Sequence, residues 1–157
     1  MNQSVTDRTH ASRLFTSTIL TIQRSPAIIP RLGFAQHYYQ TFDADRGQLG
    51  PLYNDNYSML NFEHSASRPA QYKGSAAIVD KLRSLPFSRV RHDVKTCDCQ
   101  PSPNGGVVVV ICGDLYVDEE QMPQKFSQTF QLMPTEAAGL APGSYFIFND
   151  IFRLNVG

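Results

Sequence analysis

The sequence predicts an α+β protein in which helices come first and long antiparallel strands follow. Apolar residues recur at helical spacing after Leu32 and again after Ser75. The second half of the chain instead has alternating or continuous apolar runs of strand length, separated by Gly, Pro and Asn. Because an antiparallel sheet can leave one face uncovered, we expect the helices to lie on one face of the sheet.

The composition fits one compact domain and excludes several classes of protein. Of the 157 residues, 41% are hydrophobic, which is enough for one core. The 14 basic and 14 acidic residues cancel, whereas nucleic-acid binding needs a basic surface. No apolar run reaches the roughly 18 residues of a membrane span. Cys97, Cys99 and Cys112 are too few for a disulfide framework. We expect no nucleic acid, no membrane and a reducing compartment.

Residues 1–31 differ in composition and are predicted to be a disordered extension outside the fold, which then comprises residues 32–157. They hold one acid, Asp7, together with four arginines and many Ser and Thr. An Arg-rich, Ser-rich and acid-poor N-terminus is also typical of a mitochondrial transit peptide. Of the two, an extension without a targeting role is the favoured interpretation.

The segment after Leu32 is predicted to be a long helix that ends near residues 43–47. Phe and Tyr are mediocre helix formers, so packing under a large surface must stabilise this helix. A short helical turn is expected at residues 48–53. The predicted buried face of the long helix comprises Phe34, Ala35, Tyr38, Tyr39 and Phe42.

A second helix is expected after Ser75, whose hydroxyl would cap the N-terminus. Pro86 stops this helix, because the residue before a proline avoids helical geometry. Between the two helices, residues 58–63 are predicted to be a short strand and residues 64–72 a loop. The predicted buried face of the second helix holds Ile78, Leu82 and Leu85.

The strand predicted at residues 106–117 is the most distinctive feature of the sequence. Five β-branched residues in a row, at 107–111, favour an extended backbone. This half is apolar on both faces, so we expect it to be covered on both sides. After Gly113 apolar and polar residues alternate, and the strand leads to an acidic cluster, Asp118, Glu119 and Glu120. A core strand that ends in carboxylates is a candidate functional site.

Three further strands are expected in the second half of the chain. The strand at residues 87–99 carries Val90, His92 and Val94 on one face. The strand at residues 125–133 places Phe126, Gln128, Phe130 and Leu132 on one side. The strand at residues 145–154 places Phe146, Phe148, Asp150, Phe152 and Leu154 on one face.

Five segments, in this order along the chain, resemble the nuclear transport factor 2 family. They are Phe34–Arg46 (FAQHYYQTFDADR), Ser84–His92 (SLPFSRVRH), Gly113–Glu120 (GDLYVDEE), Phe126–Leu132 (FSQTFQL) and Phe148–Leu154 (FNDIFRL). Each is a weak signal alone, but together they are highly specific. The resemblance covers about residues 34–157. It implies a curved antiparallel β-sheet wrapped around a long N-terminal helix, which is the cone-shaped cystatin-like fold, and a homodimer built sheet against sheet.

The resemblance implies a carrier and not an enzyme. Such proteins bind the GDP form of the small GTPase Ran, without a cofactor or a metal, and carry it into the nucleus through Phe-Gly-repeat nucleoporins. The implied location is the cytoplasm and nucleus, including the nuclear pore. The Ran site is the mouth of the cone, where an aromatic side chain of Ran enters a cavity and basic residues meet acids on the rim.

The resemblance also assigns the Ran site to particular residues of this sequence. The matching cavity positions are Phe62, Leu85, Phe87, Val90 and Phe152, and the matching acidic rim positions are Glu63, Asp118 and Glu120. A mostly apolar pocket with a few placed charges suits such recognition. Without the resemblance, the apolar residues would be ordinary core residues and the acids a solvated turn.

Two segments depart from the pattern of the family. Pro26, Pro30 and Gly33 shorten the N-terminal helix, so the part of the nucleoporin site that the family places there does not transfer. The loop at residues 64–72 is longer than that of the family, and it would weaken Ran binding if it folded over the mouth.

Two other functions stay open. The same fold serves ketosteroid isomerases and small dehydratases, which need an acid or base inside the cone. The candidates are His92, Asp98 and Asp150, but no catalytic pair is recognisable, and His92 is expected to be a paired structural histidine. Cys97 and Cys99 lack two further ligands at zinc spacing. The second alternative is a subunit of a heterodimeric adaptor in messenger-RNA export.

Overall fold

The structure, a computed structural model, describes residues 29–63 and 70–155, and for residues 29–32 the backbone alone. The sheet and the pocket belong to one compact unit, which begins at Ala35. Most of the predicted extension and residues 64–69 of the predicted loop lie outside the described residues. No helix among the described residues is long and apolar enough to cross a membrane.

The order of the elements confirms the predicted α+β layout. Along the chain they are α2 (Ile29–Asp45), η1 (Arg46–Leu52), β1 (Met59–Glu63), β2 (Ala70–Lys73), α3 (Ser75–Arg83), β3 (Val90–Pro101), η2 (Pro103–Gly105), β4 (Val107–Val117), β5 (Gln124–Pro134), η3 (Thr135–Ala138) and β6 (Tyr145–Leu154). Helix α2 begins earlier than predicted, and Pro30 is tolerated in its first turn because the N–H groups there have no partner within the helix.

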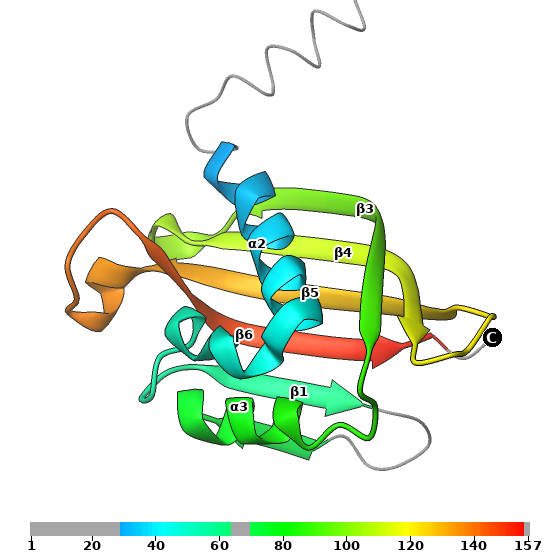
Figure 1. The fold of residues 1–157 in the computed structure, drawn as a ribbon. Helices are drawn as coiled ribbons and strands as arrows, with labels where there is room; N and C mark the ends of the chain where they lie inside the picture. The colour runs from blue at the N-terminus through cyan, green and yellow to red at the C-terminus, as the bar shows by residue number, and fades with distance from the viewer. Residues whose placement is uncertain (1–28, 64–69, 156–157) are drawn as a thin grey trace, which may run out of the picture. The chain divides into compact units, whose positions relative to one another are not determined.

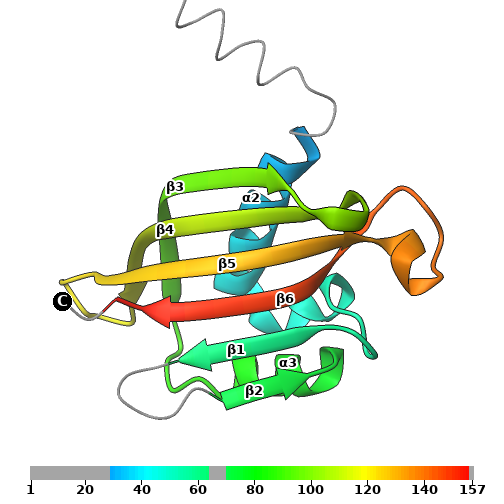
Figure 2. The ribbon, with the colours of Figure 1, turned by 180° about the vertical axis from the view of Figure 1, so that it is seen from behind.

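The strands form one six-stranded sheet in the order β2-β1-β6-β5-β4-β3. Neighbouring strands run antiparallel, as predicted, except for β1 and β6, which run parallel. In Figure 1, α3 and the part of α2 from Ala35 onward lie in front of the sheet. Figure 2 shows the opposite face of the sheet, which no described helix covers. The predicted segregation of the helices to one face is therefore confirmed.

Aromatic residues of α2 fill the space between this helix and the sheet. The ring of Tyr38 lies 4.8 Å from that of Phe130, and the ring of Tyr39 lies 5.9 Å from that of Phe126. All four of these residues are buried, as are the other inward residues predicted for β5, Gln128 and Leu132. Each buried apolar side chain contributes about 1.5–3 kcal/mol, which is how a helix rich in Tyr and Phe is stabilised.

Strand β4 is covered on one face only, so the prediction that its first half is covered on both sides is wrong for the single chain. Val109 and Ile111 are fully buried, whereas Val110 between them is 39% exposed. Ile151 on β6 is 42% exposed. The cause is that the described helices occupy only the inward face of the sheet.

Two irregularities in strand pairing change which residues face inward. In the β5–β6 pair the register shifts between Gln131 and Leu132, so Ile147 takes the inward position that was predicted for Phe148. In the β3–β4 pair the register shifts between Val94 and Thr96, and Val94 is exposed, unlike the buried Val90. Strand β3 also begins at Val90 and not at the predicted residue 87.

The N-terminus of α3 is held differently from the prediction. Its N-cap is Gly74 at a φ of 85°, and the hydroxyl of Ser75 donates to the carbonyl of Gly50 at 2.9 Å. Glycine is required at position 74, because φ is positive and a Cβ would lie 2.8 Å from the carbonyl oxygen of Asp55. The predicted loop at residues 64–72 ends earlier, because β2 pairs with β1.

Candidate functional site

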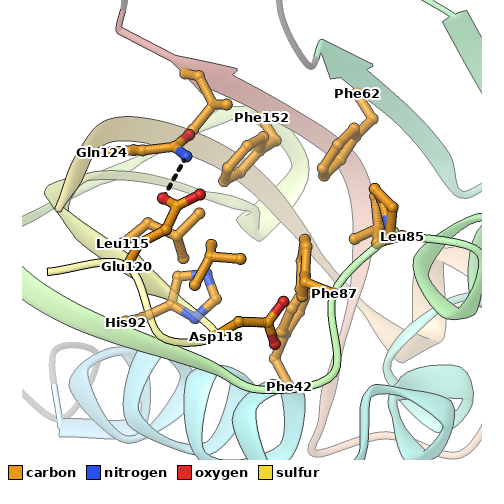
Figure 3. A pocket seen from close by; sticks show the side chains of 13 residues that line it. Phe42, Phe62, Leu85, Phe87, His92, Leu115, Asp118, Glu120, Gln124 and Phe152 are labelled. Carbon is orange, nitrogen blue, oxygen red and sulfur yellow. Dashed lines mark hydrogen bonds between the residues drawn. The ribbon is translucent and has the colours of Figure 1, made fainter. Parts of the chain in front are cut away.

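A pocket of about 230 Å³ lies between the end of β4 and the segment that joins α3 to β3 (Figure 3). Its wall is mostly apolar and is formed by Phe42, Phe62, Leu85, Pro86, Phe87, Leu115, Val117, Phe152 and Leu154. The polar residues that line it are His92, Asp118, Glu120 and Gln124. Such a lining suits an apolar group whose neighbours carry charge.

Stacked phenylalanine rings form one wall of the pocket. The rings of Phe62 and Phe152 have their centroids 4.7 Å apart and their planes inclined by 7°. They are neighbours because β1 and β6 run parallel and pair Phe62 with Phe152. Phe126 continues the stack at 5.9 Å from Phe152. Phe62 and Phe152 thus form an apolar wall against which an inserted aromatic group can pack.

His92 is fixed in the pocket wall by a carboxylate hydrogen-bond partner and by aromatic rings. Its imidazole is 2% exposed, and Nδ1 lies 2.6 Å from Oδ1 of Asp43 at the end of α2. The rings of Tyr39 and Phe42 lie 4.5 and 4.9 Å from the imidazole. The pairing expected for His92 is confirmed, and its imidazole is also part of the pocket lining.

The acidic cluster after β4 lies at the mouth of the pocket. One of its carboxylates also binds the backbone of the segment that forms the opposite wall. Oδ1 of Asp118 accepts hydrogen bonds from the backbone N–H groups of Ser88 and Arg89 at 2.9 and 2.8 Å. Asp118 itself has a φ of 47°, a left-handed conformation that aspartate tolerates better than most residues. Oε2 of Glu120 accepts from Nε2 of Gln124 at 3.1 Å.

The structure brings most of the predicted Ran-site residues together. Phe62, Leu85, Phe87, Asp118, Glu120 and Phe152 all line the pocket. Val90 does not, because it is a buried residue that borders a second, more open hollow with Asp43 and Arg91. Glu63 does not line the pocket either, and its carboxylate forms an ion pair with Arg153 on the neighbouring strand β6.

Sequence reasoning missed several lining residues. Leu115 and Val117 could have been found, because their alternation leads directly to Asp118. Gln124 gave no signal in the sequence, since it reaches the pocket by pairing with Leu115 across the β4–β5 hairpin. Phe42, Pro86, His92 and Leu154 also line the pocket outside the predicted set.

Asp150 is held in the core and is not among the residues that line the pocket. Its side chain is 1% exposed and accepts hydrogen bonds from the Tyr53 hydroxyl at 2.8 Å, the Tyr38 hydroxyl at 3.4 Å and Nε2 of Gln128 at 2.7 Å. Burial raises the pKa of Asp150 to about 6, while the three donors oppose the rise.

The other candidates for chemistry are not assembled into a site. Asp98 is exposed on strand β3, opposite Val110. Within the part of the chain that the structure describes, no group of three or more His, Cys, Asp or Glu side chains could hold a metal ion.

A curved sheet that packs on a helix and leaves an apolar pocket with carboxylates at its mouth defines a class of α+β domains. Residues 32–154 match the nuclear transport factor 2 (NTF2) domain. Nuclear transport factor 2 of Saccharomyces cerevisiae is 55% identical over 123 residues, which cover 78% of this chain and 89% of the yeast protein. The chain belongs to the nuclear transport factor 2 family, as the five sequence segments predicted.

Solved structures agree with this assignment. Nuclear transport factor 2 from Cryptosporidium parvum is 47% identical and superimposes with a TM-score of 0.68, covering 80% of this chain and 91% of that one. A putative dehydratase of the nuclear transport factor 2-like family from Streptomyces avermitilis has a TM-score of 0.63, but at 8% identity and with coverage of 82% and 96% it shows the fold alone.

Proposed function

We propose that this protein is a carrier that binds GDP-bound Ran and takes it into the nucleus through Phe-Gly-repeat nucleoporins. Relatives from Saccharomyces cerevisiae and Schizosaccharomyces pombe, 55% and 50% identical, carry the name nuclear transport factor 2. The observation that supports the Ran site most directly is the pocket. Phe62 and Phe152 stack along its wall, and Asp118 and Glu120 line its mouth.

An aromatic side chain of Ran enters this pocket and packs against the phenylalanine wall. Burying such a side chain contributes about 1.5–3 kcal/mol, and aromatic contact adds about 0.5–1.5 kcal/mol. Basic residues beside it meet Asp118 and Glu120, which add specificity and speed association. Glu63 takes part in Ran binding while its carboxylate is also paired with Arg153. Val90, which is buried in the core, supports the pocket wall.

A second copy of the chain covers the outward face of the sheet. Val110 and Ile151 are exposed on that face, which no described helix covers (Figure 2). The two residues lie in one row across the sheet, on either side of Thr129. Exposed apolar residues that gather on one face suit an interaction surface, and a two-fold symmetric pair is the commonest assembly. A chain that is stable only beside a different partner would instead favour the export-adaptor alternative.

The pocket of this protein binds and does not catalyse. Of the residues considered for catalysis, His92 is paired with Asp43, and Asp150 is paired with tyrosine hydroxyls in the core. Asp150 does not line the pocket, and Asp43 holds Nδ1 of the imidazole that does. A dehydratase or isomerase reaction would need an acid or base placed against its substrate.

We place the protein in the cytoplasm and the nucleus, and at the nuclear pore during transport. Residues 1–31 are a separate extension, and residues 32–157 form the domain. Fusing residues 1–31 to a fluorescent protein tests the alternative of mitochondrial targeting. A diffuse signal supports an extension without a targeting role, and a mitochondrial signal would overturn the placement in cytoplasm and nucleus.

Retention on immobilised Ran tests the proposed function. We expect the protein to be retained by Ran loaded with GDP and not by Ran loaded with GTP. Phe62→Ala should be retained less, provided that circular dichroism shows it to be folded. If neither Ran-GDP nor Ran-GTP retains the protein, or if both retain it equally, the carrier function is refuted.

A further inference from the structure

Arg46 contacts the aromatic wall of the pocket without lining the pocket itself. It is the first residue of η1, directly after Asp45, whose carboxylate caps that helix. Its Nη2 donates to the carbonyl oxygen of Phe87 at 2.6 Å, and its Cζ lies 4.6 Å from the centroid of the Phe87 ring. One guanidinium therefore holds both the backbone and the ring of a single residue.

Phe87 needs such support because it belongs to neither α3 nor β3. Its N–H donates to the carbonyl of Leu85 at 2.9 Å, and the next two N–H groups donate to Asp118. The regular backbone hydrogen bonds of a helix or strand therefore do not hold Phe87 in place. Figure 3 shows Phe87 beside the pocket, across from Phe152.

The geometry points to Arg46 as a positioning residue: through Phe87 it sets the width of the pocket for an aromatic group. A planar guanidinium can donate to a carbonyl and lie over a ring at the same time, which a lysine ammonium does less well. The part of this inference that concerns Ran rests on the proposed function, whereas the part that concerns a small aromatic ligand does not.

The sign of the effect separates positioning from direct electrostatics. If the ligand is a basic segment of a protein, removing a nearby cation lowers repulsion and strengthens binding. If Arg46 acts by holding Phe87, the same substitution loosens the wall and weakens binding. Removing it should also weaken binding of an uncharged aromatic molecule, for which electrostatics predicts no change.

Fluorescence titration with 1-aminoanthracene, a neutral aromatic probe, and calorimetric titration with Ran-GDP test this inference together. We expect Arg46→Ala to weaken both by about tenfold, as for the loss of one hydrogen bond to a charged group. Arg46→Lys should recover part of the affinity. Arg89→Ala is the matched control, because it removes an exposed arginine that is paired with Glu119 and should leave probe binding unchanged.

Wild-type affinity for the probe in folded Arg46→Ala would overturn the inference, as would tighter binding of Ran-GDP. If Ran-GDP fails to bind even the wild type, the proposed function falls while the probe still decides the role of Arg46. Hydrogen exchange at the amides of residues 87–89 needs no ligand. It should be about tenfold faster in Arg46→Ala, or in Arg46→Lys if the alanine variant does not fold, and unchanged exchange would contradict the inference.

Discussion

Asp43 and His92 are joined by two hydrogen bonds, one to the ring and one to the backbone. Oδ1 of Asp43 lies 2.6 Å from Nδ1 of the imidazole, and Oδ2 accepts from the backbone N–H of His92 at 3.0 Å. A single carboxylate thus ties the C-terminal end of α2 to the start of β3. The pocket lies directly beside this tie, since His92 is part of its lining.

Asp43→Ala should lower the free energy of unfolding by about 1–3 kcal/mol, because it leaves a buried imidazole without its partner. Urea denaturation followed by circular dichroism measures the change. Asp98→Ala, at an exposed position of the same strand as His92, is the control and should change stability by about 0.5 kcal/mol or less. Equal effects of the two substitutions would show that the hydrogen bonds between Asp43 and His92 contribute little to the free energy of unfolding.

Asp150 should make stability depend on pH in a defined direction. Its pKa in the folded protein is about 6, above the ordinary 3.8 of an aspartate, so folding favours its protonated form. The stabilising contribution is fully present below about pH 4 and is lost as the pH rises through about 6. At higher pH the buried charge costs on the order of 3 kcal/mol relative to the protonated form.

Asp150→Asn removes this titration and provides the comparison. The stability of the variant relative to wild type should rise by on the order of 3 kcal/mol between about pH 4 and about pH 8. Other carboxylates titrate in both proteins and cancel in the difference. Urea unfolding at a series of pH values measures it, and a difference that stays constant with pH would contradict the assignment to Asp150.

Ile151→Arg should convert the proposed homodimer to a monomer, because it places a charge on the sheet face that the second copy is proposed to cover. Light scattering coupled to size exclusion measures the mass. Leu140→Arg adds the same charge at a position that is 53% exposed in the loop before β6, and it should remain dimeric. A monomeric wild type would remove the basis for the sheet-to-sheet dimer.

The fold was predictable from the sequence because its periodicities are strong and local. The alternation along β5 identified Phe126, Gln128, Phe130 and Leu132, and all of them are buried. The exceptions occur where the pairing between strands determines which residues face inward. The register shift beside Leu132 moved Ile147 inward in place of Phe148, and no pattern within β6 reveals an irregularity that depends on its neighbour.

The candidate site was predictable only in part. The alternation after Gly113 placed Asp118 at a strand end, but its bonds to the N–H groups of Ser88 and Arg89 join segments that are distant in the sequence. The grouping of Phe62, Phe87 and Phe152 in one pocket came from the family resemblance, because composition and periodicity describe them equally well as core. Arg46 left no signal, since an arginine after a helix is usually solvated.

Calorimetric titration of the protein with Ran-GDP tests the central claim most directly. Wild type should bind Ran-GDP and not Ran-GTP. Glu120→Lys should raise the Kd roughly thirty-fold or more, because losing a close charge pair and adding repulsion costs about 2–5 kcal/mol. Glu136→Lys, an exposed charge reversal in η3 at the other end of the sheet (Figure 1), should bind like wild type. No heat with wild type, or equal affinity of the two variants, would contradict the account.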